Sequence, residues 1–428
     1  MYTNQSINTK SSKYSRLFTI FMCLMPFLNI YGTHMIPALR IGEVVMLIVI
    51  CYIFLFRQKI NIYNDNKFYW MAIIYIIGIS FILTVVINTY SISDTTIRVF
   101  RVLFYTFLAL NMSKTYFDID IGERLYVVLS TVASLIVLIQ FLILQVSGEY
   151  ITFILPKMNL STNHDTSEQY FAQIAHDLMW YGKSTRPSGV FLEPSHFCEY
   201  AIFSLVFLLF SDKIKKNKLL MILINTIAIV ISGSAIGYFG LLVIFFIWLI
   251  EQMCGYKVNA KIFILGIIGV ILIVIFSVKF NLWSKAIWRL MTINSTESST
   301  GNLRILRGFV IFSKMPFLYK IIGMGIGNFG AFIEKYNIVT YFDATLNRTN
   351  EFMNTISVIL VSGGIVGLCL YIFAIFNIFR KANRIQRVFF WVLMVFLLTS
   401  NNFYKESYMF TIIFMTITNN KEEKSNDR

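Results

Sequence analysis

The chain has 428 residues, of which 57% are hydrophobic and only 14% are charged, with a formal net charge of +15. A soluble protein of this length needs a charged surface that this composition does not supply, so the composition predicts a membrane protein. Basic residues occur in short clusters between apolar runs, and no stretch rich in Lys and Arg carries interleaved aromatic side chains. We therefore expect membrane lipid, and no nucleic acid, as a partner.

Apolar runs recur along the whole chain, each close to the roughly 20 residues that a membrane-spanning helix requires. They predict an all-α fold, with residues 1–428 forming a single integral membrane domain of about twelve transmembrane helices. In chain order the predicted spans are 17–33, 36–56, 68–88, 97–112, 125–147, 190–210, 217–233, 235–250, 262–280, 352–379, 387–401 and 407–418.

The distribution of Lys and Arg predicts the orientation, because short cytoplasmic loops carry an excess of both. If the N-terminus is cytoplasmic and the spans alternate, most basic clusters fall in the cytoplasm. The short outer turns near 89–96 and 232–234 then hold neither Lys nor Arg. This predicts that both termini are cytoplasmic and that two large loops, about 148–189 and 281–350, lie on the far side. Loops of this length are usually functional or disordered.

The second large loop contains a helix-like stretch, 302–314. Its apolar residues share one face, whereas Arg304, Arg307 and Lys314 crowd another. This amphipathic pattern predicts a helix lying along the membrane surface.

The most informative segment is 186–200, which reads RPSGVFLEPSHFCEY and enters the sixth predicted span. Ionisable groups at a membrane entrance are costly unless paired or hydrated, so they are functional candidates. If the helix begins at Pro194, His196 and Tyr200 share one face and Glu193 lies near the N-cap. The alternative is that these residues only cap the helix at the water interface.

A set of arginines lies on the predicted outer side, where orientation does not require them. Guanidinium groups bind phosphate oxygens in pairs and stay charged in a partly dry site, so these arginines predict a diphosphate site. The alternatives are anionic lipid headgroups or local carboxylates, such as a pair of Arg40 with Glu43. The set comprises Arg40, Arg98, Arg101, Arg186, Arg289, Arg304 and Arg307.

Other motifs argue against alternative chemistry. Gly325, Gly327 and Gly330 match Gly-x-Gly-x-x-Gly, but the strand and cytosolic setting of a dinucleotide fold are missing, so a tight turn re-entering the site is expected. His34, His164, His176 and His196 are scattered, with no carboxylates at metal-ligand spacing. We expect no metal and no cofactor.

Together these segments resemble the O-antigen polymerase (Wzy) and O-antigen ligase superfamily. Segment 186–196 resembles the family's Arg-x-x-Gly-x-Phe-x-x-Pro stretch, and it is the only specific match. Shorter likenesses occur at four other places. Residues 232–234 resemble the family's Ser-x-Ser turn, and Arg304 and Arg307 with Pro316 and the glycine run resemble its long second loop. Residues 350–352 resemble the start of the family's span after that loop, which is the tenth span here, and residues 39–43 resemble the start of its second span.

The resemblance implies a reaction and its setting. A polymerase of this family transfers a growing glycan from undecaprenyl diphosphate to a sugar hydroxyl of the next lipid-linked repeat unit, at the outer face of the inner (cytoplasmic) membrane. It implies undecaprenyl-diphosphate-linked oligosaccharide as substrate, with a chain-length regulator and a flippase as partners. The expected catalytic residues are Arg186, Arg304 and Arg307 for the diphosphate, Glu193 or His196 as base, and Glu351 behind them. Further substrate contacts are expected from Arg40, Arg98, Arg101, Arg289, Tyr200 and Asn350.

Ligases of this superfamily carry a His immediately before the Asn at the junction of the second loop and the following span. Thr349 occupies that position here, which favours a polymerase over a ligase. A lipid-linked oligosaccharide flippase or another carrier is the alternative from a different class. Carriers, however, usually show internal repeats and place their polar residues near the middle of the membrane.

Overall fold

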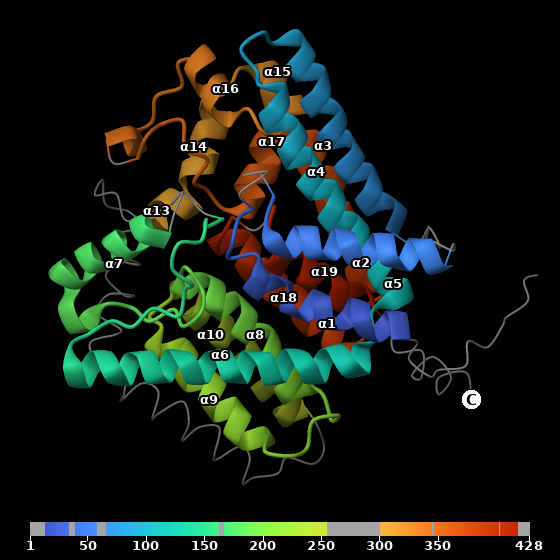
Figure 1. Ribbon diagram of the computed structural model, residues 1–428. Helices are drawn as coiled ribbons and strands as arrows, with labels where there is room; N and C mark the ends of the chain where they lie inside the picture. The colour runs from blue at the N-terminus through green and yellow to red at the C-terminus, as the bar shows by residue number, and fades with distance from the viewer. Residues whose placement is uncertain are drawn as a thin grey trace, which may run out of the picture.

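A computed structural model of the protein describes residues 13–33, 39–57, 66–161, 167–254, 300–344, 346–401 and 403–417 (Figure 1). Within these ranges the fold is all-helical, as predicted, and only two isolated β-bridges occur. The ninth predicted span, 262–280, and Arg289 lie outside the described residues.

The first five predicted spans all fall on helices. α4 continues through a π-helical turn, Leu108–Met112, into α5. Asp118 begins α6 by accepting hydrogen bonds from the backbone N–H groups of Asp120 and Ile121, which satisfies donors that a helix start leaves free. The helices are α1 (Lys13–Leu28), α2 (Ile41–Arg57), α3 (Lys67–Val86), α4 (Ile92–Phe107), α5 (Ser113–Tyr116) and α6 (Ile119–Ser147).

The middle of the chain contains one helix that was not predicted, α7 (Ser167–Tyr181), inside the first long loop. A 3₁₀ turn, Gly182–Ser184, follows it. The next three helices match the sixth, seventh and eighth predicted spans. They are α8 (Pro194–Phe210), α9 (Lys218–Ile231) and α10 (Ala235–Cys254).

From residue 300 onward, the described part of the second long loop carries four short helices and a 3₁₀ turn, Tyr341–Ala344, and three longer helices follow. The short helices are α13 (Thr300–Ile305), α14 (Arg307–Lys314), α15 (Phe317–Ile322) and α16 (Phe329–Lys335). The last three are α17 (Thr355–Arg380), α18 (Arg384–Thr399) and α19 (Glu406–Thr416).

The predicted amphipathic helix over 302–314 differs from the observed structure. It is broken between α13 and α14, and Arg307, which was placed on the exposed face, is buried together with Gly308 and Ile311. α14 packs on α17, and a Cβ at Gly308 would lie 2.1 Å from the Cβ of Ser357. The stretch is therefore anchored to the bundle through the face that carries Arg307.

Within the described residues, four helices are long and apolar enough to cross a membrane: α3, α6, α17 and residues Ala235–Gln252 of α10. Three shorter helices, Ile41–Phe56, Pro194–Phe210 and Lys218–Ile231, are also apolar. Such helices are typical of a membrane protein, because the side chains that face lipid are apolar and each helix satisfies its own backbone hydrogen bonds.

α8 lies at the centre of one half of the bundle, packed against α6, α9, α10 and α18. Most of its residues are buried, which agrees with a helix that is apolar on every side. An aromatic cluster surrounds its middle, and Tyr126 of α6 stacks on Tyr200 with ring centroids 4.1 Å apart. This packing holds the N-terminal end of α8 in a fixed position.

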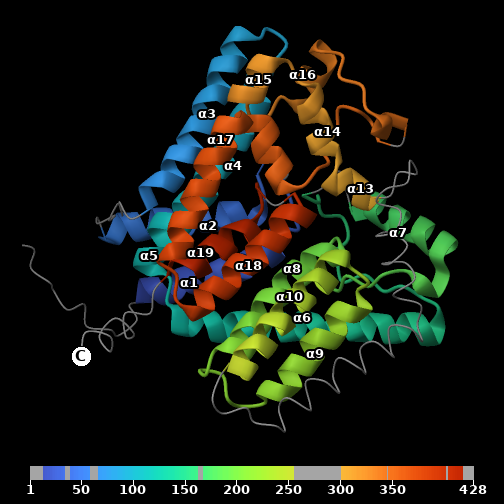
Figure 2. The same cartoon turned by 180° about the vertical axis from the view of Figure 1, so that it is seen from behind.

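The other half contains α3 and α17, which lie side by side in both views (Figures 1 and 2). α17 is interrupted at Gly364, whose φ of 65° is not helical. The glycine-rich segment docks at this break, where the N–H groups of Met324 and Gly325 donate to the carbonyls of Val361 and Ser362. The motif is thus a structural turn that satisfies backbone groups freed by the break, and none of its residues lines the cavity described below.

Candidate functional site

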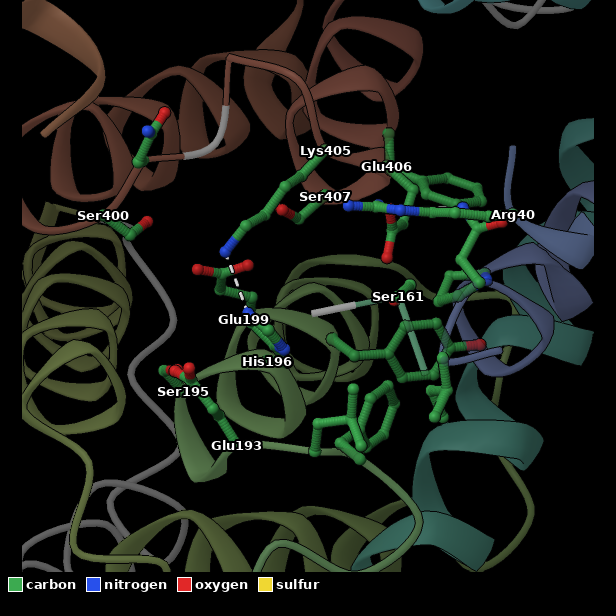
Figure 3. A pocket seen from close by; sticks show the side chains of 18 of the residues that line it. Arg40, Ser161, Glu193, Ser195, His196, Glu199, Ser400, Lys405, Glu406 and Ser407 are labelled. Carbon is green, nitrogen blue, oxygen red and sulfur yellow. Dashed lines mark hydrogen bonds and ion pairs between the residues drawn. The ribbon is translucent and has the colours of Figure 1, made fainter. Parts of the chain in front are cut away.

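A cavity of about 350 Å³ opens at the N-terminal end of α8 (Figure 3). Its lining includes residues of α1, α6, α7, α8 and α13, the segment that precedes α17, and the start of α19. Figure 3 shows Glu193 and Ser195 at one end, Arg40 and Glu406 at the other, and His196, Glu199 and Lys405 between them. Charged groups from distant parts of the chain therefore meet in one hollow.

The entrance of α8 agrees with the prediction from the sequence. Pro194 occupies the first helical turn, where its missing N–H costs nothing, and Glu193 is the N-cap residue. The carboxylate of Glu193 accepts a hydrogen bond from Ser195 Oγ at 2.8 Å and pairs with Arg304 Nη2 at 3.5 Å. One end of the cavity is therefore bordered by an arginine and a carboxylate already in contact.

His196 faces a cation that was not among the predicted site residues. Its Nε2 lies 2.8 Å from Nζ of Lys405, the residue that precedes α19. A lysine ammonium has only donors, so this contact requires Nε2 to be the acceptor and leaves it without a proton. In this arrangement Nε2 of His196 is occupied by Lys405.

Arg40 and Arg101 belong to a buried charge network beside the cavity. The side chain of Arg40 pairs with Glu406 at 3.2 Å, while its backbone N–H donates to Glu43. Arg101 binds Glu43 through Nε at 2.6 Å and through Nη2 at 3.3 Å. The side-chain pair of Arg40 with Glu43, the alternative considered from the sequence, is therefore replaced by two other pairs, because Arg101 binds the carboxylate of Glu43.

Arg98 and Glu351 form an ion pair that ties α4 to the segment preceding α17. The guanidinium of Arg98 also lies over the ring of Tyr404, 5.4 Å from its centroid. Glu351 lines the cavity, whereas Asn350 is exposed and contributes its backbone carbonyl to Arg307. Tyr200 lines the cavity and donates its hydroxyl hydrogen to the carbonyl of Cys23.

Arg186 lies behind the cavity wall. Gln140 of α6 anchors its loop by accepting from the N–H groups of Ser188 and Gly189 at 3.0 and 2.9 Å. A Cβ at Gly233 would lie 3.3 Å from Cδ of Arg186, so the side chain passes over the 232–234 turn. Segment 186–200 and the turn 232–234, both noted in the sequence, are therefore in contact.

The electrostatic surroundings of Arg186 include the groups at the cavity end. Burial lowers the pKa of Arg186, the carboxylate of Glu193 raises it, and the neighbouring guanidinium of Arg304 lowers it again. An anion placed between Arg186 and Arg304 would relieve this repulsion.

Arg304 and Arg307 have different surroundings although they are three positions apart. Arg304 lines the cavity and lies over the ring of Phe352, 5.1 Å from its centroid. Arg307 is 1% exposed and donates to the backbone carbonyls of Arg348, Asn350 and Phe352. Arg307 thus shapes the segment before α17, and Arg304 is the arginine of this loop that borders the cavity.

The cavity contains two charged residues that were not among the predicted functional candidates, Lys405 and Glu406, and it contains Glu199, the second glutamate of the predicted segment 186–200. The signal for Lys405 was present, because a lysine immediately before the last apolar run lies on the predicted outer side, like the arginines. Among the described residues no group of three His, Cys, Asp or Glu side chains is placed to hold a metal ion.

Compared with known proteins, the chain matches no protein-family model and no curated protein sequence. Its function is therefore argued from the cavity, together with the resemblance of its short motifs.

Proposed function

We propose that the protein is a polysaccharide repeat-unit polymerase, a membrane glycosyltransferase. It would transfer the growing glycan from undecaprenyl diphosphate to a sugar hydroxyl of the next lipid-linked repeat unit. The observation that carries the proposal is the cavity itself, where Arg304 stands at one end, with Arg186 behind it, and further ionisable side chains continue inward.

The chemistry needs a site that stabilises a leaving diphosphate and orients an attacking hydroxyl. Preorganised guanidinium groups meet the first need, because they stabilise charge that grows on the diphosphate as the glycosidic bond breaks. Arg304 supports this role because it borders the cavity and its carboxylate partner, Glu193, is at the long distance of 3.5 Å. A shallow cavity with polar groups along its length suits the second need, since it holds one sugar against the next.

The proposed setting includes about twelve spans in the inner (cytoplasmic) membrane, with both termini in the cytoplasm and the cavity open to the outer side. The chain-length regulator and flippase expected from the resemblance are proposed partners. A transporter or a ligase would give a different result in a complementation experiment.

The test is complementation of a strain that lacks its repeat-unit polymerase, scored by the glycan ladder on a gel with membrane levels measured by immunoblot. Wild type should restore the ladder. Arg304→Ala should leave single repeat units, with a loss of roughly a hundredfold or more in rate. Arg124→Ala, an exposed arginine at the start of α6, is the matched control and should restore the ladder.

A wild-type protein that restores no ladder, but moves lipid-linked units outward in a flippase-deficient strain, would replace the enzyme proposal with a transporter. Attachment of glycan to a lipid acceptor without chain extension would indicate a ligase.

A further inference from the structure

The groups that line the cavity differ in whether they already have partners. Glu193 is held by Ser195 and Arg304, and Nε2 of His196 is held by Lys405. Glu351 is held by Arg98. Each candidate base suggested by the sequence therefore has a protein partner.

Glu199 differs from all three. It lies one turn after His196 on α8, lines the cavity, and is only 2% exposed. Its Oε1 has no hydrogen-bond partner among the described residues. A buried carboxylate oxygen without a donor is costly, so its persistence in a cavity points to a group that binds there.

Three further polar atoms of the same cavity share this property. Oγ of Ser407, at the start of α19, and the Oδ1 atoms of Asn401 and Asn29 have no hydrogen-bond partner among the described residues. A hydroxyl, an amide oxygen and a carboxylate are a set that binds hydroxyl groups, since each accepts an O–H donor. The carboxylate and the amide oxygen do not match a phosphate, which needs donors.

We infer that the part of the cavity lined by Glu199, Asn401 and Ser407 binds the acceptor sugar, and that Glu199 is the general base. The inference rests on the proposed function and adds to it the second substrate site, for a polyhydroxy sugar of the incoming repeat unit. Arg304 would then bind the diphosphate of the donor, at the end of the cavity where it pairs with Glu193.

The step balances without another reactant. The acceptor hydroxyl gives its proton to the carboxylate of Glu199, and its oxygen forms a bond to the anomeric carbon of the donor. The bond from that carbon to the diphosphate oxygen breaks, and its electron pair leaves on the diphosphate. Glu199 then returns the proton to water or to the departing diphosphate.

Lys405 supports this assignment by its position. Its ammonium is anchored on His196, whose place on α8 is one turn before Glu199 (Figure 3). Through this contact Lys405 fixes the imidazole of His196 one turn before Glu199. We assign Lys405 as a positioning residue, because it acts through its neighbours.

The experiment uses the full chain, purified in nanodiscs, with lipid-diphosphate-linked repeat units extracted from the source strain lacking this protein. Rates of ladder formation are measured across pH, and binding of the repeat units is measured separately. Glu199→Gln should lower the rate by roughly a hundredfold or more, retain binding, and abolish the fall in rate at acidic pH. Glu334→Gln, an exposed carboxylate of α16, is the matched control.

Glu199→Asp covers the case in which the amide variant fails to fold. Aspartate keeps the carboxylate but has a shorter side chain, so the rate of this variant should be lower than that of wild type and should still fall at acidic pH. A Glu199→Gln protein that keeps the wild-type rate would overturn the inference, and so would one whose reduced rate still falls at acidic pH. Either result would assign the general base to another residue and leave the proposed polymerase function in place. A wild-type protein that forms no ladder would remove the proposed function and this inference together.

Discussion

Arg304 and Arg307 show how two identical side chains in one loop acquire different roles. Arg304 meets the cavity, where a substrate anion has access to it. Arg307 is enclosed, with its guanidinium bound to three backbone carbonyls and placed 5.6 Å from the ring centroid of Phe329. The difference follows from the break between α13 and α14, which turns the two residues to different neighbours.

The two arginines therefore predict opposite results on stability. Arg307→Ala removes a buried guanidinium together with the hydrogen bonds that it donates to three backbone carbonyls, and it should lower the free energy of unfolding by about 3 kcal/mol. Arg304→Ala should abolish the ladder at unchanged stability, since its side chain is partly exposed. Melting temperatures of the two purified variants in detergent, compared with wild type, test this. Equal losses of stability in both variants would contradict the assignment.

At the scale of elements, the glycine-rich segment 323–330 links α3 to α17. Gly325 has a φ of 81° and approaches α3 so closely that a Cβ would lie 2.8 Å from Cα of Ser80. Ser80 Oγ in turn accepts from the N–H of Ile326 at 2.8 Å. The segment thus joins α3 to the break in α17, which explains why glycines recur here without any nucleotide chemistry.

Gly325→Ala should destabilise the protein by about 1–3 kcal/mol, because alanine is strained at positive φ and its Cβ meets the backbone of α3. The matched control is Gly78→Ala in α3, where an added Cβ meets no heavy atom within 4 Å. That change should be neutral or stabilise the helix by up to about 1 kcal/mol. Thermal unfolding in detergent measures both. Equal tolerance of the two changes would argue against the docked turn.

At the scale of the whole molecule, the cavity draws on both long loops and on the N-terminal ends of α8 and α19. The proposed orientation places these parts on the outer side and the turn between α8 and α9 in the cytoplasm. Met179 of α7 is 87% exposed, and Lys215 in that turn is exposed as well. Each offers a position for a reporter of sidedness.

In a background without native cysteines, Met179→Cys should react with a membrane-impermeant maleimide added from the outer side of the cytoplasmic membrane. Lys215→Cys should react only after that membrane is opened. The extent of labelling, read on a gel, gives the sidedness of each position. The reverse pattern would invert the topology and place the cavity on the cytoplasmic side, which is incompatible with the proposed substrate.

The sequence alone determined that the chain is helical and where most helices lie, because apolar runs of the right length must form helices that satisfy their own backbone hydrogen bonds in lipid. It also located the entrance of α8, since Glu193-Pro194 is a local start signal. Helix α7 escaped prediction because its residues are not an apolar run.

Only the tertiary structure decided which charged groups face one another. His196 meets Lys405 across 209 positions of the chain, and Arg98 meets Glu351 across 253. Composition and local periodicity carry no information about such distant partners, because they depend on how whole helices pack. The same packing buried Arg307, exposed Arg304 to the cavity, and left Oε1 of Glu199 without a hydrogen-bond partner among the residues that the structure describes.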